Sequence, residues 1–223
     1  MPTPRARFID AVTLLTGIAS IAVAGKMLLT RPTSPQPKTE IREISNWSKL
    51  VEAGRRIGPE GATLEVLEWG DYECPACRGF HLQLSALQRK YPRDVAIAFR
   101  HFPLDYHKAA YFAARAAECA ASQGNFAAMH AMLLEGTQLD YETFVGYAKN
   151  ANLPDLDAFR LCLDDRNPVE RIETDLAVAR AISARGTPTV VVNGTLYAPP
   201  PDSSALEQLL LDILASANEQ GGS

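Results

Sequence analysis

The chain has little cysteine for its length and no excess of charge of either sign. Four cysteines in 223 residues are too few for a scaffold built on disulfides. Lysine and arginine (22) do not outnumber aspartate and glutamate (26), so the formal net charge of −4 argues against a protein that coats nucleic acid. The sequence has no repeat period and no low-complexity tract, which argues against solenoids and collagen-like chains. What remains is an ordinary globular composition, 47% hydrophobic and 22% charged.

The first 30 residues differ from the rest of the chain. Arg5 and Arg7 precede an apolar run from Phe8 to Leu29, which fits either a membrane-spanning helix or the shorter apolar core of a signal peptide. The sequence favours an uncleaved single-pass anchor, and cleavage after Ala22-Val23-Ala24 stays open as the alternative. Both interpretations leave the arginines inside and export the bulk of the chain. We therefore expect residues beyond the anchor to work outside the cytoplasm, on a membrane or as a periplasmic or secreted protein.

Apolar periodicity predicts two β-rich halves separated by helices. Thr63–Trp69 and Val95–Phe99 have the character of buried strands, and residues 75–91 between them repeat apolar side chains at helical spacing. Helical patterns fill residues 107–185, and Thr189–Val192 begins a β-β-α unit. We expect an α/β fold in which a β-α-β unit and a distant β-β-α unit complete one sheet, with an all-helical block inserted between them.

These patterns divide the chain into four parts. Residues 1–30 are the anchor or signal peptide, and residues 31–60 are a proline-containing extended linker and lead-in. Residues 61–106 and 186–218 together form the domain that holds the sheet. Residues 107–185 form the helical insertion.

Local signals predict where several elements start and stop. Asp140 is expected to cap a helix over the residues that follow it. Asn167-Pro168-Val169-Glu170 combines a capping side chain, a first-turn proline and a glutamate, and predicts a helix that runs to Arg185 and stops at Gly186. Asn193-Gly194 predicts a two-residue hairpin.

Two of the four cysteines form the motif Cys74-Pro75-Ala76-Cys77 where a predicted strand meets a predicted helix. Free backbone N–H groups and the helix dipole at such a junction stabilise a thiolate. Cys77 lies one turn further along the same face, so its sulfur can reach that of Cys74. The spacing predicts a redox-active pair, in which Cys74 forms the mixed disulfide with a client protein and the reduction potential sets the direction.

A zinc half-site is the alternative interpretation of this motif, and it needs two further ligands. The sequence has no second Cys-x-x-Cys, so His81 and one of Cys119, His101 or His107 would have to supply them. The surrounding pattern favours redox chemistry. We find no motif for an organic cofactor and predict neither a cofactor nor a metal.

Four motifs carry a resemblance to a known family. They are Asp71-Tyr72-Glu73-Cys74-Pro75-Ala76-Cys77, Phe102-Pro103-Leu104, Ala117-Glu118-Cys119-Ala120-Ala121-Ser122-Gln123-Gly124 and Gly186-Thr187-Pro188-Thr189. With these motifs in this order, residues 63–217 resemble the DsbA-like thioredoxin-fold thiol:disulfide oxidoreductases, in which a helical domain interrupts a thioredoxin fold.

The resemblance implies a role for each matching residue. Cys74 is implied to be the nucleophile and Cys77 its resolving partner. Thr187 and Pro188 are implied to form the loop that faces the disulfide and binds substrate, with a cis bond before the proline; a plain helix-to-strand stop is the alternative. Glu68 matches a buried acid that relays protons to the resolving cysteine, and the alternative is a solvated strand carboxylate.

The chain departs from the best-known oxidases of the family at Ala76. Many of them carry a histidine there, whose charge helps to stabilise the thiolate. The departure puts the oxidising strength in doubt but not the redox role.

The other two cysteines, Cys119 and Cys162, lie on predicted helices of the insertion. Because an exported protein exposes unpaired thiols to oxidation, we expect a structural Cys119–Cys162 disulfide. Two buried, unpaired cysteines that pack as small apolar side chains are the alternative.

These observations lead to one functional prediction. The chain is expected to be an extracytoplasmic thiol:disulfide oxidoreductase that exchanges the Cys74–Cys77 disulfide with exported client proteins, as a disulfide donor. The family resemblance implies a membrane partner that passes the electrons on to a quinone. A reductase or isomerase with the same chemistry and a redox-inactive client-binding module stay open as alternatives.

Overall fold

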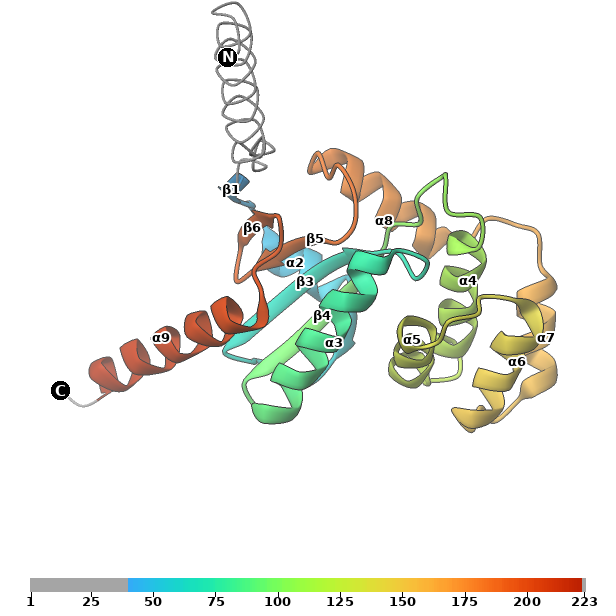
Figure 1. Ribbon diagram of the computed structural model, residues 1–223, viewed down its shortest axis with the longest axis horizontal. Coiled ribbons are helices and arrows are strands. Elements are labelled where there is room, and N and C mark those ends of the chain that lie inside the picture. The colour runs from blue at the N-terminus through green and yellow to red at the C-terminus, as the bar shows by residue number, and fades with distance from the viewer. Residues whose placement is uncertain (1–39, 222–223) are drawn as a thin grey trace, which may run out of the picture. The chain divides into compact units, whose positions relative to one another are not determined.

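The structure, a computed structural model, describes residues 40–221 (Figure 1). The anchor or signal peptide expected over residues 1–30 lies outside the described residues. Six strands form one mixed sheet in the order β1-β6-β5-β3-β4-β2. The strands are β1 (Glu40–Glu43), β2 (Arg55–Ile57), β3 (Leu64–Gly70), β4 (Val95–His101), β5 (Thr189–Val192) and β6 (Thr195–Ala198).

Along the described chain, helices lie between strands, and five of them follow one another between β4 and β5 (Figure 1). They are α2 (Trp47–Glu52), α3 (Pro75–Lys90), α4 (Ala110–Ala121), α5 (Phe126–Glu135), α6 (Tyr141–Asn150), α7 (Leu156–Asp164), α8 (Glu170–Ala181) and α9 (Ser203–Gly221). None of these helices is both long enough and apolar enough to cross a membrane.

The two distant halves meet at β3, as the sequence predicts. β3 pairs in parallel with β4 and antiparallel with β5, which brings the β-α-β unit and the β-β-α unit into one sheet. The side chains of β3 alternate between two cores. Leu64 and Val66 pack with α3 and α9, whereas Leu67 and Trp69 pack with α2 and α8 on the opposite face. Helices therefore cover both faces of the sheet.

The helices α4–α7 have a core of their own beside the sheet. Met129, Leu133, Phe144 and Phe159 are fully buried within it, and the same core continues into Phe99 on β4 and the cysteine motif at the start of α3. The insertion is therefore packed directly against the redox motif. The fold is the thioredoxin-like fold with a helical insertion that the sequence predicts.

The stretch from residue 40 to residue 57 contributes to the sheet, whereas the sequence predicts an extended lead-in there. β1 pairs with β6 and β2 with β4, both antiparallel, so this stretch supplies both edge strands. These strands are short and carry several charged residues, and their place is set by pairing with distant partners.

The predicted bounds of the helix before Gly186 are wrong at both ends. The structure starts α8 at Glu170, because the Asn167 side chain bonds to Asp165 and does not cap the helix. α8 ends at Ala181, and Ser183 then adopts the left-handed conformation (φ 56°), which turns the chain out of the helix before it reaches Gly186. Asp140, by contrast, caps α6 by accepting from the Thr143 N–H, as expected.

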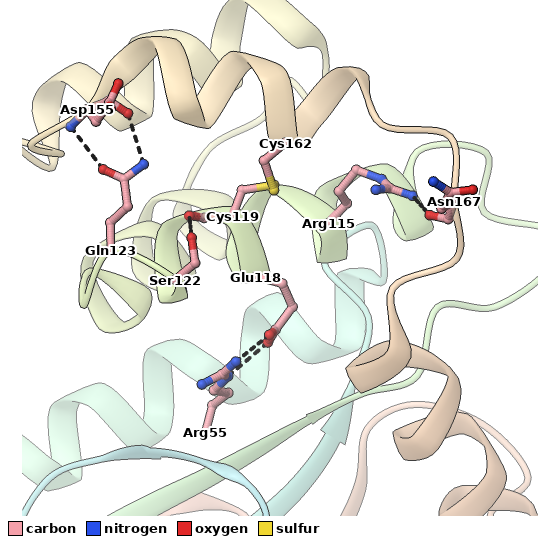
Figure 2. The surroundings of a disulfide bond; sticks show 9 residues. All are labelled: Arg55, Arg115, Glu118, Cys119, Ser122, Gln123, Asp155, Cys162 and Asn167. Atoms are coloured by element: carbon pink, nitrogen blue, oxygen red, sulfur yellow. Dashed lines mark hydrogen bonds and ion pairs between the residues drawn. A yellow bond between two sulfur atoms is a disulfide. The ribbon is translucent and has the colours of Figure 1, made fainter.

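A disulfide joins Cys119 on α4 to Cys162 on α7, with a Cα–Cα distance of 5.8 Å (Figure 2). The neighbouring Glu118 points the other way, toward the sheet, and forms an ion pair with Arg55 of β2. Glu118 also bonds to the imidazole of His101 at the end of β4, at 2.8 Å. One turn of α4 is therefore fixed to α7 on one side and to the sheet on the other.

Candidate active site

The cysteine motif lies where β3 gives way to α3. Cys74 is the N-cap residue of α3 with extended backbone angles (φ −72°, ψ 121°), and Pro75 occupies the first turn, where no backbone N–H is needed. Both thiols are free, and 7% of Cys74 and none of Cys77 is exposed. Cys74 lies nearer to the surface of the two.

The surroundings shift the pKa values of the two thiols in opposite directions. The thiol of Cys77 and the backbone N–H groups of Cys77 and Ala76 lower the pKa of Cys74 to about 5, although burial opposes them. The same contact with Cys74, together with burial, raises the pKa of Cys77 far above its usual range. The Asp71 N–H also donates to the Cys77 sulfur, at 3.5 Å. At neutral pH the pair therefore holds a thiolate on Cys74 and a thiol on Cys77.

Glu68 lies beneath the pair, on the β3 face that packs against α3. Only 1% of its surface is exposed, and its Oε1 has no hydrogen-bond partner among the described residues. Burial and the negative charge of Cys74 raise its pKa to about 8, although a hydrogen bond with Cys77 opposes the shift. Gly70 keeps the space open, because a Cβ there would lie 2.9 Å from Oε1. Glu68 is thus a protonated acid in contact with Cys77 at neutral pH.

The loop before β5 faces Cys74. The Thr187–Pro188 bond in this loop is cis, as the resemblance implies. The carbonyl oxygen of Thr187 lies 3.4 Å from the Cys74 sulfur, and the Thr189 hydroxyl fixes the loop by donating to the Gly186 carbonyl at 2.7 Å. The junction of β3 and α3 therefore meets the loop before β5, which lies more than 100 residues further along the chain.

Asp71 organises the turn that carries Cys74, a role that the sequence analysis did not predict. The side chain is 1% exposed and accepts from the backbone N–H groups of Glu73, at 2.7 Å, and Leu104, at 2.8 Å. Its second oxygen also bonds to His107 Nδ1, at 2.8 Å. The position of Asp71 three residues before Cys74, within a matching motif, is the only sequence signal for this role.

A buried cluster of aromatic and histidine side chains lies behind the turn. The Tyr72 hydroxyl bonds to His130 Nδ1 at 3.1 Å, which connects the turn to α5. His101 and His130 are 0% and 2% exposed, so both histidines lie inside the protein. Trp69 and Tyr72 are also fully buried. The cluster supports the turn through packing.

The side chains that a zinc site would need are engaged elsewhere. Cys119 is in the disulfide, His101 bonds to Glu118 and His107 bonds to Asp71. Among residues 40–221 no three histidine, cysteine or acidic side chains are grouped so that they could hold a metal ion.

The comparisons with known proteins agree with this architecture. A family model described as Thioredoxin matches residues 50–212. A Na⁺/H⁺ antiporter NhaA 3 from Salinispora tropica is 40% identical over 162 residues, which are 72% of this chain and 24% of that protein. The chain thus spans about a quarter of the length of this curated relative.

Solved structures resemble the chain over most of their own length. A thioredoxin-like oxidoreductase from Silicibacter pomeroyi DSS-3 is 27% identical, with a TM-score of 0.60 over 75% of this chain and 93% of that one. The thiol-disulfide exchange protein alpha-DsbA2 from Wolbachia pipientis has a TM-score of 0.62 over 76% of this chain and 91% of that one, and its 19% identity supports the fold alone.

Fold and site together define a thioredoxin-fold thiol–disulfide oxidoreductase. The chain belongs to the thioredoxin family, and its helical insertion between β4 and β5 gives it the DsbA-like architecture.

Proposed function

We propose that this protein is a disulfide donor, which in its oxidised form transfers the Cys74–Cys77 disulfide to cysteine pairs of exported proteins. The observation that carries the proposal is the pKa of Cys74, lowered to about 5. Only the reduced pair contains this thiolate, so its stabilisation favours the reduced form and makes the disulfide a stronger oxidant. Ala76 adds no charge, and the hydrogen bonds at the start of α3 provide the stabilisation instead.

In the first step a client thiolate attacks the sulfur of Cys74. A bond forms between the client sulfur and Cys74, the Cys74–Cys77 bond breaks, and the electron pair leaves on Cys77. The carboxyl of Glu68, protonated below its pKa of about 8, gives its proton to the departing Cys77 sulfur.

In the second step another client thiolate attacks the client sulfur of the mixed disulfide. The client disulfide forms, and Cys74 leaves as the thiolate that its surroundings stabilise. Two electrons pass from the client to the protein, which ends with the two free cysteines that the structure contains.

Thr187 and Pro188 are proposed to hold the client main chain during these steps. Thr187 is partly exposed, and its carbonyl oxygen lies 3.4 Å from the Cys74 sulfur. A client segment that pairs with this backbone as an added strand would bring its cysteine to Cys74.

The proposed place of action is the outer face of a membrane, with residues 1–30 as the anchor. A Cys119–Cys162 disulfide on the insertion supports an oxidising compartment. To act again, the reduced pair of Cys74 thiolate and Cys77 thiol must give two electrons to an oxidant and release the proton of Cys77. We propose a membrane partner that passes the electrons to a quinone, as the family resemblance implies.

The test is the reduction potential of the Cys74–Cys77 pair in the full chain. The protein is equilibrated in glutathione redox buffers, free thiols are alkylated, and each cysteine is followed by mass spectrometry. A potential of about −120 to −180 mV is expected for a donor. A value near about −270 mV would replace the donor with a reductase. A pair that never exchanges would reject both and leave a client-binding module.

A further inference from the structure

Two grooves flank the loop that faces Cys74, and they share the same walls. The first, here called the redox groove, has a volume of about 220 Å³ and runs between the start of α3, at Ala76 and Phe80, and the prolines Pro188 and Pro200. The second, here called the far groove, also has a volume of about 220 Å³ and lies on the other side of those two prolines. Because Pro188 and Pro200 line both grooves, a polypeptide bound at Thr187 can extend from one into the other.

The far groove is formed where α8 ends beside the edge of the sheet. Ser183 turns left-handed (φ 56°), and the Ala184 N–H donates back to the Ala179 carbonyl, which ends the helix. The residues that follow, up to Pro188, then line the groove together with Leu196 of β6. The end of α8 earlier than the sequence predicts is therefore what places Arg185 beside the site.

The charged side chains of the far groove are not equivalent. Arg42 is paired with Glu40 at 3.0 Å and also donates to the Ile182 carbonyl. Arg185 is exposed, and within residues 40–221 it has neither an ion pair nor a side-chain hydrogen bond. The charged residue of the redox groove, Asp202, is instead occupied as the cap of α9, where it accepts from the Ser204 hydroxyl and the Ala205 N–H. The far groove thus offers one uncompensated cation.

From this arrangement we infer that the far groove binds a client segment that carries a carboxylate, which pairs with Arg185 while the client cysteine reacts at Cys74. The inference rests on the proposed exchange function and names the class of client that it prefers: a polypeptide with aspartate or glutamate a few residues to one side of the cysteine. An exposed ion pair contributes about 0.2–1 kcal/mol, which corresponds to a rate advantage of about 1.4- to fivefold.

The test uses synthetic nine-residue peptides with a central cysteine activated as the disulfide of thionitrobenzoate. The Cys74 thiolate of the reduced full chain attacks the peptide sulfur, the peptide–Cys74 bond forms, and the coloured thionitrobenzoate leaves. In one series a single glutamate moves through the four positions on each side of the cysteine, and all other positions are uncharged. The same disulfide of 2-mercaptoethanol, here called the small-thiol reagent, has neither a peptide nor a charge on its thiol and measures the reactivity of Cys74 alone.

We expect glutamate on one side of the cysteine to raise the rate about 1.4- to fivefold over glutamine. Arg185→Gln should abolish this preference and Arg185→Glu should reverse it. Arg93→Glu is the matched control, because Arg93 is exposed in the turn before β4, lines neither groove and has no partner among the described residues. The reaction with the small-thiol reagent, which has no carboxylate on its thiol, should stay the same in all variants.

Two results would overturn the inference alone. One is a wild-type protein with no positional preference, and the other is a preference that survives Arg185→Glu, while the small-thiol reagent still reacts. A wild-type protein that releases no thionitrobenzoate even from the small-thiol reagent would overturn the exchange function itself, and the client preference with it.

Discussion

The chain contains two cysteine pairs whose surroundings make them opposite in kind. Cys74 and Cys77 are free and lie in the first turn of α3. Cys119 and Cys162 are joined across 43 residues, and each lies in the last turn of its helix, α4 or α7. The positive end of a helix stabilises a thiolate, and the negative end disfavours it. The same side chain therefore becomes an exchangeable sulfur at one helix end and a structural link at the other.

The comparison extends to the neighbours of each pair. Cys74 has N–H donors and a thiol around its sulfur, with an acid of raised pKa close by, so each sulfur can gain or lose a proton as bonds exchange. Beside Cys119, Glu118 is held by Arg55 and His101 and has no contact with the sulfur in Figure 2. The first site is arranged for proton transfer and the second for rigidity.

The largest effect is expected from removing the nucleophile. Cys74→Ser should reduce disulfide transfer to a reduced client by about a thousandfold or more, because the serine hydroxyl forms no disulfide. Transfer is measured by the alkylation pattern of the client with time. The double variant Cys119→Ala with Cys162→Ala is the control and should keep most of the activity. Loss of transfer in both variants to the same extent would remove the functional contrast between the pairs.

The second effect concerns stability. In a Cys74→Ser, Cys77→Ser background, replacing Cys119 and Cys162 with alanine should lower the free energy of unfolding by about 4 kcal/mol, since the disulfide closes a loop of 43 residues in the unfolded chain. Urea unfolding followed by circular dichroism gives the difference. An unchanged midpoint would show that packing between α4 and α7 holds the insertion without the link.

The sequence predicts those parts of the molecule that depend on local signals. β3, α3, β5 and the Asn193-Gly194 turn lie within a residue or so of their predicted bounds, because apolar periodicity, Pro75 and the turn residues act over a few positions. The left-handed angles of Asn193 (φ 44°) and Gly194 (φ 95°) are those that this turn type requires. The cysteine motif is placed correctly for the same reason.

What the sequence does not predict depends on partners far along the chain. β1 and β2 exist because β6 and β4 pair with them, and their own charged residues are not typical of strands. Asp71 and His130 are polar and would be expected at the surface, but backbone N–H groups in one case and Tyr72 in the other satisfy them inside. Such burial is decided by tertiary contacts, which no single-sequence pattern contains.

The third effect concerns the pH dependence of the stability that Glu118 contributes where the insertion meets the sheet. Hydrogen bonds from His101 and Arg55 outweigh burial, which opposes them, and lower the pKa of Glu118 from 4.5 to about 2. A depressed carboxyl pKa adds stability that is present above pH 4.5 and lost as the pH falls toward 2. Glu118→Gln should therefore cost about 3 kcal/mol at neutral pH and progressively less in acid.

Urea unfolding of the wild type and of Glu118→Gln at pH 7, 4.5 and 3 measures this loss. Glu60→Gln is the control, because Glu60 is exposed and has no ion pair among the described residues. A difference between wild type and Glu118→Gln that does not narrow in acid would show that the charge of Glu118 does not hold α4 to β2.

The last effect tests whether proton transfer by Glu68 distinguishes the Cys74–Cys77 pair from the structural pair. When Cys77 attacks a mixed disulfide on Cys74, its proton must leave, and the Glu68 carboxylate, formed above its pKa of about 8, is placed to take it. The rate of this attack should rise with pH through about 8 in the wild type. Glu68→Gln should remove that inflection and slow the attack by about a hundredfold above it.

The release of glutathione from a Cys74–glutathione disulfide, followed from pH 6 to 10, measures the rate. Glu65→Gln is the matched control on the same strand, because Glu65 faces away from α3 and pairs with Arg56 at 2.9 Å. If Glu68→Gln keeps the wild-type pH profile, water deprotonates Cys77, and the two pairs differ only in the helix ends on which they lie.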